Sequence, residues 1–145
     1  MVLNLVKLCV GCDSVEHLVE SVERRKARQK KAGEALEYIH TTRMIPKRAG
    51  ELVQGGSLYW VIKGNIQCRQ RLIAVRPFTD ANGISRCDLV MEPMVISTYW
   101  QPKRAFQGWR YLKGSEAPAD LTGGKEGMAS VPAELRLELA ELGLL

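Results

Sequence analysis

Apolar residues recur along this 145-residue chain with two periods, one typical of a helix and the other of strands. The helical period follows Asp13 and Ser14, either of which can cap a helix, and it ends before Gly33. Residues 24–31 continue the same predicted helix with six basic side chains, which we expect to extend into water. The apolar stripe consists of Val15, Leu18, Val19 and Val22.

Shorter apolar segments bounded by Gly, Asn and Asp predict strands. Ser57–Ile62 is apolar on both faces and is expected to be a central strand. Pro46 opens a short helix that Gly55 and Gly56 close, and Gly64-Asn65 predicts a two-residue hairpin with Gly at its first turn position. The other strands are expected near residues 2–9, 36–42, 66–78, 84–91, 94–100 and 109–112.

These elements predict an α+β fold: a curved antiparallel sheet or pseudobarrel of five or six strands, with a long N-terminal helix packed on it. We expect residues 1–113 to form a single domain and residues 114–130, rich in Gly, Ala, Pro and Ser, to form a loop or linker. Residues 131–145 are predicted to form a short C-terminal helix that packs on the domain through Leu135, Leu139 and Leu142.

Composition and charge narrow the class of partner. The chain is 46% hydrophobic and 26% charged, without the long apolar run of a membrane helix or a recognisable signal peptide, so we expect a cytoplasmic protein with no membrane partner. Residues 43–113 contain twelve basic and four acidic residues, whereas residues 114–145 contain two basic and six acidic ones. The basic centre favours polyanions or anionic ligands, unless the acidic tail neutralises it.

Five of the nine aromatic residues fall between positions 99 and 111, with basic residues among them. Aromatic faces and guanidinium groups together hold bases and phosphates, although the same residues also close the core of a small domain. The residues concerned are Tyr99, Trp100, Lys103, Arg104, Phe106, Trp109, Arg110 and Tyr111.

The predicted hairpin places Trp60 opposite Arg69 and Leu58 opposite Arg71, on one face of the sheet. A Trp beside two Arg residues is a stacking platform for a base, with the guanidinium groups reaching phosphate. The alternative is a cross-strand cation–π pair that a helix covers.

A third group of basic residues, Arg43, Lys47 and Arg48, precedes the predicted short helix. Helix N-termini with adjacent basic residues bind phosphate, so these residues predict either an anion site or simply a polar helix start. An anionic-ligand pocket between this helix and the sheet would be compatible with a small enzyme.

Cys9 and Cys12 lie between a strand and a helix, a position compatible with a structural, redox or metal role. A zinc site would need two further ligands, and neither His17 nor His40 has the spacing for that. There is no Walker loop, dinucleotide fingerprint or catalytic triad signature. We therefore predict no catalytic residue, metal or cofactor. Cys68 and Cys87 lie in apolar strand patterns and are expected to be buried.

Five distinctive strings are spread along the chain: KLCVGCDS at 7–14, MIPKR at 44–48, GGSLYWVIKG at 55–64, RQR at 69–71 and FQGWRYL at 106–112. With these strings the chain resembles, along nearly its whole length, an alphaproteobacterial family catalogued as domain of unknown function 1489. This resemblance implies a bacterial cytoplasmic protein and no particular activity. A looser likeness, from the Gly-Gly turn through the Tyr-Trp strand and hairpin, is to PUA-like and ASCH-type pseudobarrels, which implies binding of RNA or modified nucleotides.

The sequence thus favours a module that binds nucleic acid, RNA in particular, or a nucleotide on a basic-aromatic sheet face. The alternatives are a small enzyme or anionic-ligand protein with a pocket near Arg43–Arg48, and a subunit that binds another protein. The predicted binding residues are Trp60, Arg69, Arg71, Arg43, Lys47, Arg48, Lys103, Arg104, Trp109 and Arg110.

Overall fold

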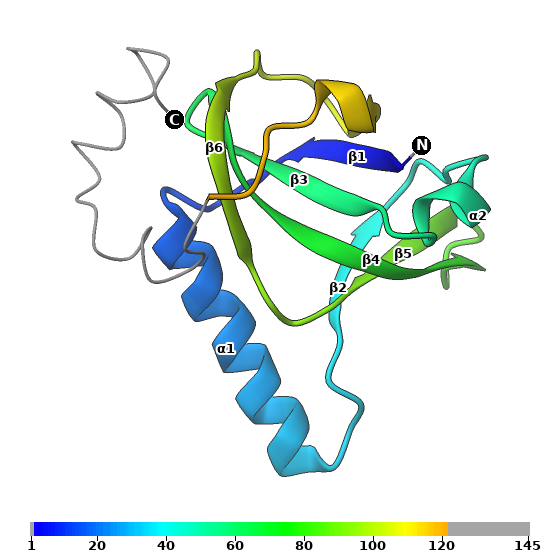
Figure 1. Ribbon diagram of the computed structural model, residues 1–145. Helices are drawn as coiled ribbons and strands as arrows, with labels where there is room; N and C mark the ends of the chain where they lie inside the picture. The colour runs from blue at the N-terminus through cyan, green and yellow to red at the C-terminus, as the bar shows by residue number, and fades with distance from the viewer. Residues whose placement is uncertain (1, 122–145) are drawn as a thin grey trace.

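A computed structural model of the chain describes residues 2–121. The predicted C-terminal helix at 131–145 and most of the predicted 114–130 linker lie outside these residues. Figure 1 shows a mixed α+β fold with a seven-stranded sheet that does not close into a barrel. Its elements, in chain order, are β1 (Leu3–Leu8), α1 (Val15–Ala32), β2 (Tyr38–Thr42), α2 (Ala49–Leu52), β3 (Ser57–Ile62), β4 (Asn65–Thr79), β5 (Ser85–Met91), β6 (Ile96–Pro102), β7 (Trp109–Lys113) and the single 3₁₀ turn η1 (Gly114–Glu116).

The sheet is not entirely antiparallel, as the sequence had led us to expect. Its strand order is β2-β5-β4-β3-β1-β7, and β6 pairs with β4 beside this path. β1 and β3 are parallel neighbours, with Leu5 opposite Leu58 and Leu8 opposite Val61. Parallel neighbours need a long crossover connection, and here the chain passes through α1, β2 and α2 between the two strands.

The 15-residue strand β4 gives the sheet its curvature. Its first part, from Asn65 to Arg69, pairs with β6, and its second part, from Leu72 to Thr79, pairs with β5. β5 and β6 therefore follow one another along the same edge of β4. Irregular pairing between Leu72 and Ala74 marks the change of partner, and such bulges increase the bend and twist of a strand.

The main core lies between the sheet and the first half of α1. Val15, Leu18 and Val22 are buried there, whereas Val19 is 37% exposed and does not belong to the buried stripe. Ser14 caps the helix by accepting a hydrogen bond from the His17 amide. The sheet side of this core includes Leu5, Leu58, Trp60, Ile62, Cys68, Leu72, Cys87, Leu89 and Met91.

The basic second half of α1 is not wholly surrounded by water, in contrast to the expectation. The Arg25 guanidinium lies over the Tyr38 ring and donates a hydrogen bond to the Ile39 carbonyl at 2.8 Å. The Gln29 side chain hydrogen-bonds both the carbonyl and the amide of Glu37. These contacts tie the helix to the start of β2. No helix among residues 2–121 has the length and apolar composition needed to span a membrane.

The opposite face of the central strands is covered by a smaller apolar cluster. Val6, Tyr59, Val61, Ile66 and Leu112 form it, with Phe106 and Ala117 against them. Residues 114–121, here called the 114–121 segment, cross this face and run beside β6 (Figure 1), where the Tyr99 amide donates to the Ala119 carbonyl. Burial on both faces confirms the prediction of a central strand at Ser57–Ile62.

The Gly55-Gly56 turn offers a direct test of this packing. A Cβ at Gly56 would collide with the backbone carbonyls of Leu3 and Leu52, so Gly56→Ala forces β1 and α2 apart. Overpacking a core lowers the free energy of unfolding by about 1–3 kcal/mol, and we expect Gly56→Ala to lose at least that much. A Cβ at Gly55 meets nothing within 4 Å, and only its left-handed φ of 92° opposes a side chain. Gly55→Ala should therefore cost about 1–2 kcal/mol. Urea unfolding of both variants checks the order, and equal losses would contradict it.

Candidate functional site

The β3–β4 hairpin determines which predicted site residues share a face, and its register differs from the expectation. The two-residue loop is Lys63-Gly64, not Gly64-Asn65, and both of its residues have positive φ. A further irregularity lies between Trp60 and Val61. Trp60 therefore pairs with Cys68, and Arg69 pairs with Tyr59. A slip of one residue moves a side chain to the other face, so the predicted Trp60–Arg69 face is wrong.

Trp60 belongs to the main core instead. It is 3% exposed, its indole nitrogen donates to the Gln70 side-chain carbonyl at 2.9 Å, and its ring meets the edge of His40 at 5.7 Å. An indole so enclosed offers no surface on which a base could stack. Tyr59 takes its place opposite Arg69, on the face that the 114–121 segment covers.

Arg69 is held by a fork of hydrogen bonds across this face. Its Nε and Nη2 donate to the two carboxylate oxygens of Asp120, each at 2.8 Å, and Nη1 donates to the Ser57 hydroxyl at 2.8 Å. The pair holds the pKa of Asp120 below its usual range and raises the pKa of Arg69. Asp120 thereby fastens the 114–121 segment to β4.

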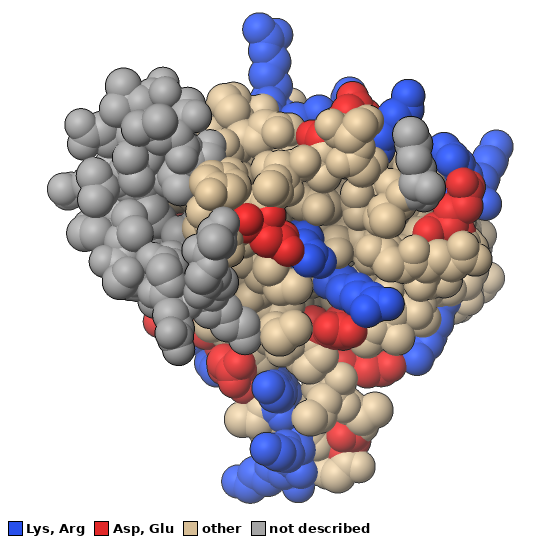
Figure 2. All heavy atoms as spheres, in the orientation of Figure 1, with Lys and Arg blue, Asp and Glu red and all other residues tan. Residues whose placement is uncertain are grey.

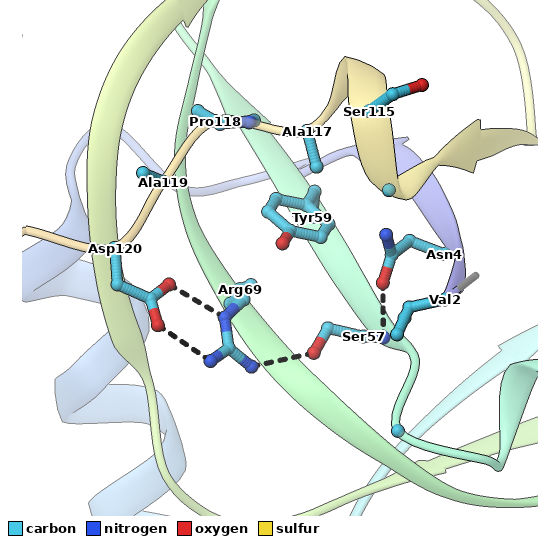
Figure 3. Close-up of a pocket in the computed structure, with 12 residues that line it drawn as sticks. Val2, Asn4, Ser57, Tyr59, Arg69, Ser115, Ala117, Pro118, Ala119 and Asp120 are labelled. Carbon is cyan, nitrogen blue, oxygen red and sulfur yellow. Dashed lines mark hydrogen bonds and ion pairs between the residues drawn. The ribbon is translucent and has the colours of Figure 1, made fainter.

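A pocket of about 610 Å³, here called the Tyr59 pocket, lies between the sheet and the 114–121 segment. Figure 3 shows the Tyr59 hydroxyl pointing toward the Arg69–Asp120 pair and the Asn4 amide nitrogen turned away from Ser57, toward the η1 side. Asn4 is 3% exposed and Tyr59 7% exposed. The pocket is also lined by Ser57, Arg69 and Asp120 and by seven further residues, Val2, Gly55, Gly114, Ser115, Ala117, Pro118 and Ala119.

Two polar groups in this pocket have no hydrogen-bond partner among residues 2–121. The Asn4 side-chain oxygen accepts from the Ser57 amide at 2.9 Å, which leaves the Asn4 amide nitrogen free. The Tyr59 hydroxyl also lacks a partner, and burial raises its pKa, so it remains protonated at neutral pH. Neither atom is fully enclosed, because among the described residues only Trp100 Nε1 is buried without a partner, so both groups are open to a ligand in the pocket.

Charge at the Tyr59 pocket is partly balanced. Asp120 offsets Arg69, whereas Arg71, two residues along β4 and therefore on the same face, is exposed and has no ion pair among the described residues. On the face that Figure 2 shows, basic side chains are spread among acidic ones and do not gather into one patch. Arg71 is thus the uncompensated cation nearest this pocket in the strand.

The basic residues of the 103–110 segment gather around one ring. The Lys103 ammonium lies 5.9 Å and the Arg110 guanidinium 5.0 Å from the centre of the Phe106 ring. Arg104 is exposed. Phe106 packs against the same apolar cluster as Tyr59, so these cations border the covered face of the sheet.

The structure joins Trp109 to the Arg43–Arg48 region. Trp109 is 6% exposed, and its indole nitrogen donates to the Met44 carbonyl at 2.7 Å. Tyr111 accepts from the Arg48 amide at 3.1 Å and lies under the Arg48 guanidinium. The pocket here, of about 550 Å³, has mainly apolar walls formed by Met44, Ile45, Lys47, Arg48, Trp109 and Tyr111.

This apolar pocket fits the predicted anion site poorly. The Arg48 guanidinium already forms an ion pair with Glu51, with 2.6 Å between Nε and Oε2. The helix that follows, α2, has only four residues, too few to build an N-terminal anion site. Arg43 and Lys47 are exposed, and Arg43 does not line the pocket.

Cys9 and Cys12 border a third cavity, near the start of α1. All four cysteines are free, and Cys68 and Cys87 are fully buried as predicted. Burial raises the pKa of Cys9 and of Cys68, which keeps both thiols protonated at neutral pH. Within residues 2–121, no three His, Cys, Asp or Glu side chains are arranged to hold a metal ion.

Sequence reasoning missed several residues of the Tyr59 pocket. Asn4 carried a usable signal, because it is a polar residue within an apolar strand and is therefore expected to have a specific role. Asp120 carried none, because it lies in a segment without periodicity. Ser57 and Tyr59 were assigned to a strand without a role in binding.

The two buried donors predict different effects on stability. Asn4→Ala removes the acceptor of the Ser57 amide and should destabilise the protein by about 1–3 kcal/mol. Tyr59→Phe removes a hydroxyl that has no partner among the described residues and should change the free energy of unfolding by less than about 0.5 kcal/mol. Thermal and urea unfolding measure both, and a large loss in Tyr59→Phe would show that its hydroxyl is structural.

Comparison with known proteins adds a family and no function. Searches of curated proteins and of solved structures gave no match. One family model matches residues 5–145, with the description "Protein of unknown function (DUF1489)". The match covers nearly the whole chain, as the resemblance of the sequence strings indicated, and the chain belongs to the DUF1489 family.

Proposed function

We propose that this protein binds a nucleotide unit, either free or within single-stranded RNA, in the Tyr59 pocket. One observation carries the proposal: the mostly buried side chains of Asn4 and Tyr59 each present, to a pocket that Arg69 lines, a polar group without a partner among the described residues. Small-molecule sites typically enclose about 300–1,000 Å³ and contain a few well-placed polar groups, and this pocket has both properties.

The polar groups suit the edge of a nucleobase. A side-chain amide donates to ring nitrogens and carbonyl oxygens, which are the groups read on unstacked bases. The Tyr59 hydroxyl can donate or accept, according to the base presented. Because a bound base displaces the water that these groups contact, a base that pairs with both groups is favoured over one that leaves them unpaired.

The arginines suit the phosphate. Arg69 uses three of its five N–H groups on Asp120 and Ser57, so two remain for a ligand. Arg71 adds a cation that no described acidic residue neutralises. The excess of basic residues between positions 43 and 113 would add a general attraction for an anionic strand.

The resemblance to PUA-like and ASCH-type domains supports the same class of ligand. Those pseudobarrels bind RNA or modified nucleotides, and a curved sheet with a helix on one face is compatible with such a fold. This support is an analogy of fold, so the polar groups of the pocket remain the main argument.

Binding of the four nucleoside monophosphates and of a short labelled RNA, measured by calorimetry and fluorescence anisotropy, tests the proposal. Tyr59→Phe should weaken binding about threefold to tenfold and leave its salt dependence unchanged, because it removes one neutral hydrogen bond. Arg71→Ala should lower the slope of log K against log salt for RNA by about 0.7, because it removes one phosphate contact.

Arg28→Ala is the matched control for Arg71→Ala, because it removes the same charge from an exposed position on α1. It should leave nucleotide affinity unchanged. If Arg28→Ala and Arg71→Ala weaken binding equally, only a general charge attraction is present and the pocket is not the site. Absence of binding at low salt would also overturn the proposal.

Asp120→Asn provides a second prediction, with the opposite sign. Removing the carboxylate frees the Arg69 guanidinium for phosphate, so the affinity for a nucleoside monophosphate should rise severalfold. The loss of stability should be only about 0.5–1 kcal/mol, because both partners are partly exposed. Calorimetry with the variant checks this, and a fall in affinity would mean that Asp120 itself contacts the ligand.

A further inference from the structure

The third cavity, bordered by Cys9 and Cys12, lies on the other side of β3 from the Tyr59 pocket. Its volume is about 320 Å³, and its walls come from the Cys9–Cys12 turn, α1, β2 and Trp60. Trp60 and Tyr59 are consecutive in β3 and belong to the apolar clusters on opposite faces of the sheet. The sheet therefore separates the two pockets, and a ligand in one does not contact the other.

The arginines at this cavity form no ion pair with an acidic residue among residues 2–121. Arg24, Arg25, His17 and His40 line it, and none of its lining residues is Asp or Glu. Lys7 lies close enough to act electrostatically on both Cys9 and His40, and it forms no ion pair with a described residue. Other cations of this protein, such as Arg48 and Arg69, have carboxylate partners.

The effect of this arrangement appears in the titration of two side chains. His40 has its pKa lowered to about 4 by burial and by repulsion from Lys7 and Arg25. Burial also lowers the pKa of Lys7. Burial disfavours the charged form of both groups, and an anion placed among them would offset that cost and the repulsion that Lys7 and Arg25 exert on His40.

We propose that this cavity binds a small oxyanion, either free phosphate or the phosphate group of a small monoester, through Arg24 and Arg25, which line it, with the nearby Lys7 adding positive charge. Guanidinium groups recognise such oxygens with paired hydrogen bonds. Arg25 already donates through one nitrogen to the Ile39 carbonyl, and the stack on Tyr38 holds its plane in position. The size of the cavity suits an anion of this kind with few additional atoms.

His40 makes the binding dependent on pH. The charged and titratable groups that face it are Lys7 from β1, Arg24, Arg25 and His17 from α1, and the thiols of Cys9 and Cys12. An oxyanion among them stabilises the imidazolium and raises the pKa of His40. By reciprocity, the anion binds more tightly as the pH falls toward that pKa.

The histidine resonances in nuclear magnetic resonance spectra provide the test, because the chain has only two histidines and His17→Gln assigns them. Sulfate is the probe for the pH series, since it does not titrate between pH 4 and 8. We expect saturating sulfate to raise the pKa of His40 from about 4, and the affinity for sulfate to be higher at pH 5 than at pH 7.5.

Variants separate this site from the Tyr59 pocket and from general charge effects. Arg24→Ala and Lys7→Met should each weaken sulfate binding at least fivefold, whereas Tyr59→Phe, Arg71→Ala and Arg28→Ala should not. Arg24 is exposed, so its variant retains the packing of the core even if Lys7→Met does not. An unchanged pKa of His40 at saturating sulfate, or an equal effect of Arg28→Ala, would overturn the proposal.

Two ligands identify the source of the anion. Inorganic phosphate and glycerol phosphate are each titrated at pH 7 into protein that holds sulfate. Displacement of sulfate is followed by the change in the His40 resonance. Tighter binding of glycerol phosphate supports a phosphorylated small molecule, and tighter binding of inorganic phosphate supports the free ion. Failure of both to displace sulfate would overturn the assignment to phosphate chemistry. Neither result depends on whether the Tyr59 pocket binds nucleotides.

Discussion

The register of the β3–β4 hairpin is the constraint on which both candidate sites depend. The Lys63-Gly64 turn and the irregular pairing beside Trp60 together decide which side chains face the helix and which face the 114–121 segment. With this register, Trp60, Cys68 and Gln70 lie on the helix side. A shift of one residue would expose the core side chains, so the burial of Ser57–Ile62 on both faces holds the hairpin in register.

Strand β3 of this hairpin separates two different environments. On one side, the Tyr59 hydroxyl shares a pocket with a balanced Arg–Asp pair and with the Asn4 amide nitrogen, and neither group has a hydrogen-bond partner among the described residues. On the other side, Trp60 lines a cavity together with two arginines and two histidines, and its described lining residues include no carboxylate. One pocket is thus suited to selecting a polar ligand by its hydrogen bonds, and the other to attracting a small anion by charge.

Ion pairing explains why the basic centre of the sequence is a poor guide to the binding surface. Arg48, Arg69, Arg76 and Arg86 each have an acidic partner, from elements close by or far along the chain. The available charge therefore rests on side chains such as Arg71 that have no partner among the described residues. A count of basic residues cannot separate these two groups, because pairing depends on the folded positions of the acidic ones.

The sequence by itself determined most of the local elements. The Ser14 and Gly33 caps, the strand at Ser57–Ile62 and the exclusion of a long membrane helix depend on residues within a few positions of each other. Of the predicted site residues, Arg69 and Arg71 do share a face, because alternation along one strand is a local property.

Only the tertiary structure decided the register, the parallel β1–β3 pair and the composition of the pockets. A positive φ at Lys63 is uncommon for a residue other than glycine, and local turn rules therefore favoured the wrong loop. The partner of Arg69 lies 51 residues away in a segment without periodicity, and Trp109 reaches Met44 across 65 residues. Such contacts follow from the packing of whole elements, which no local pattern contains, because the energy that selects them is the burial of the complete core.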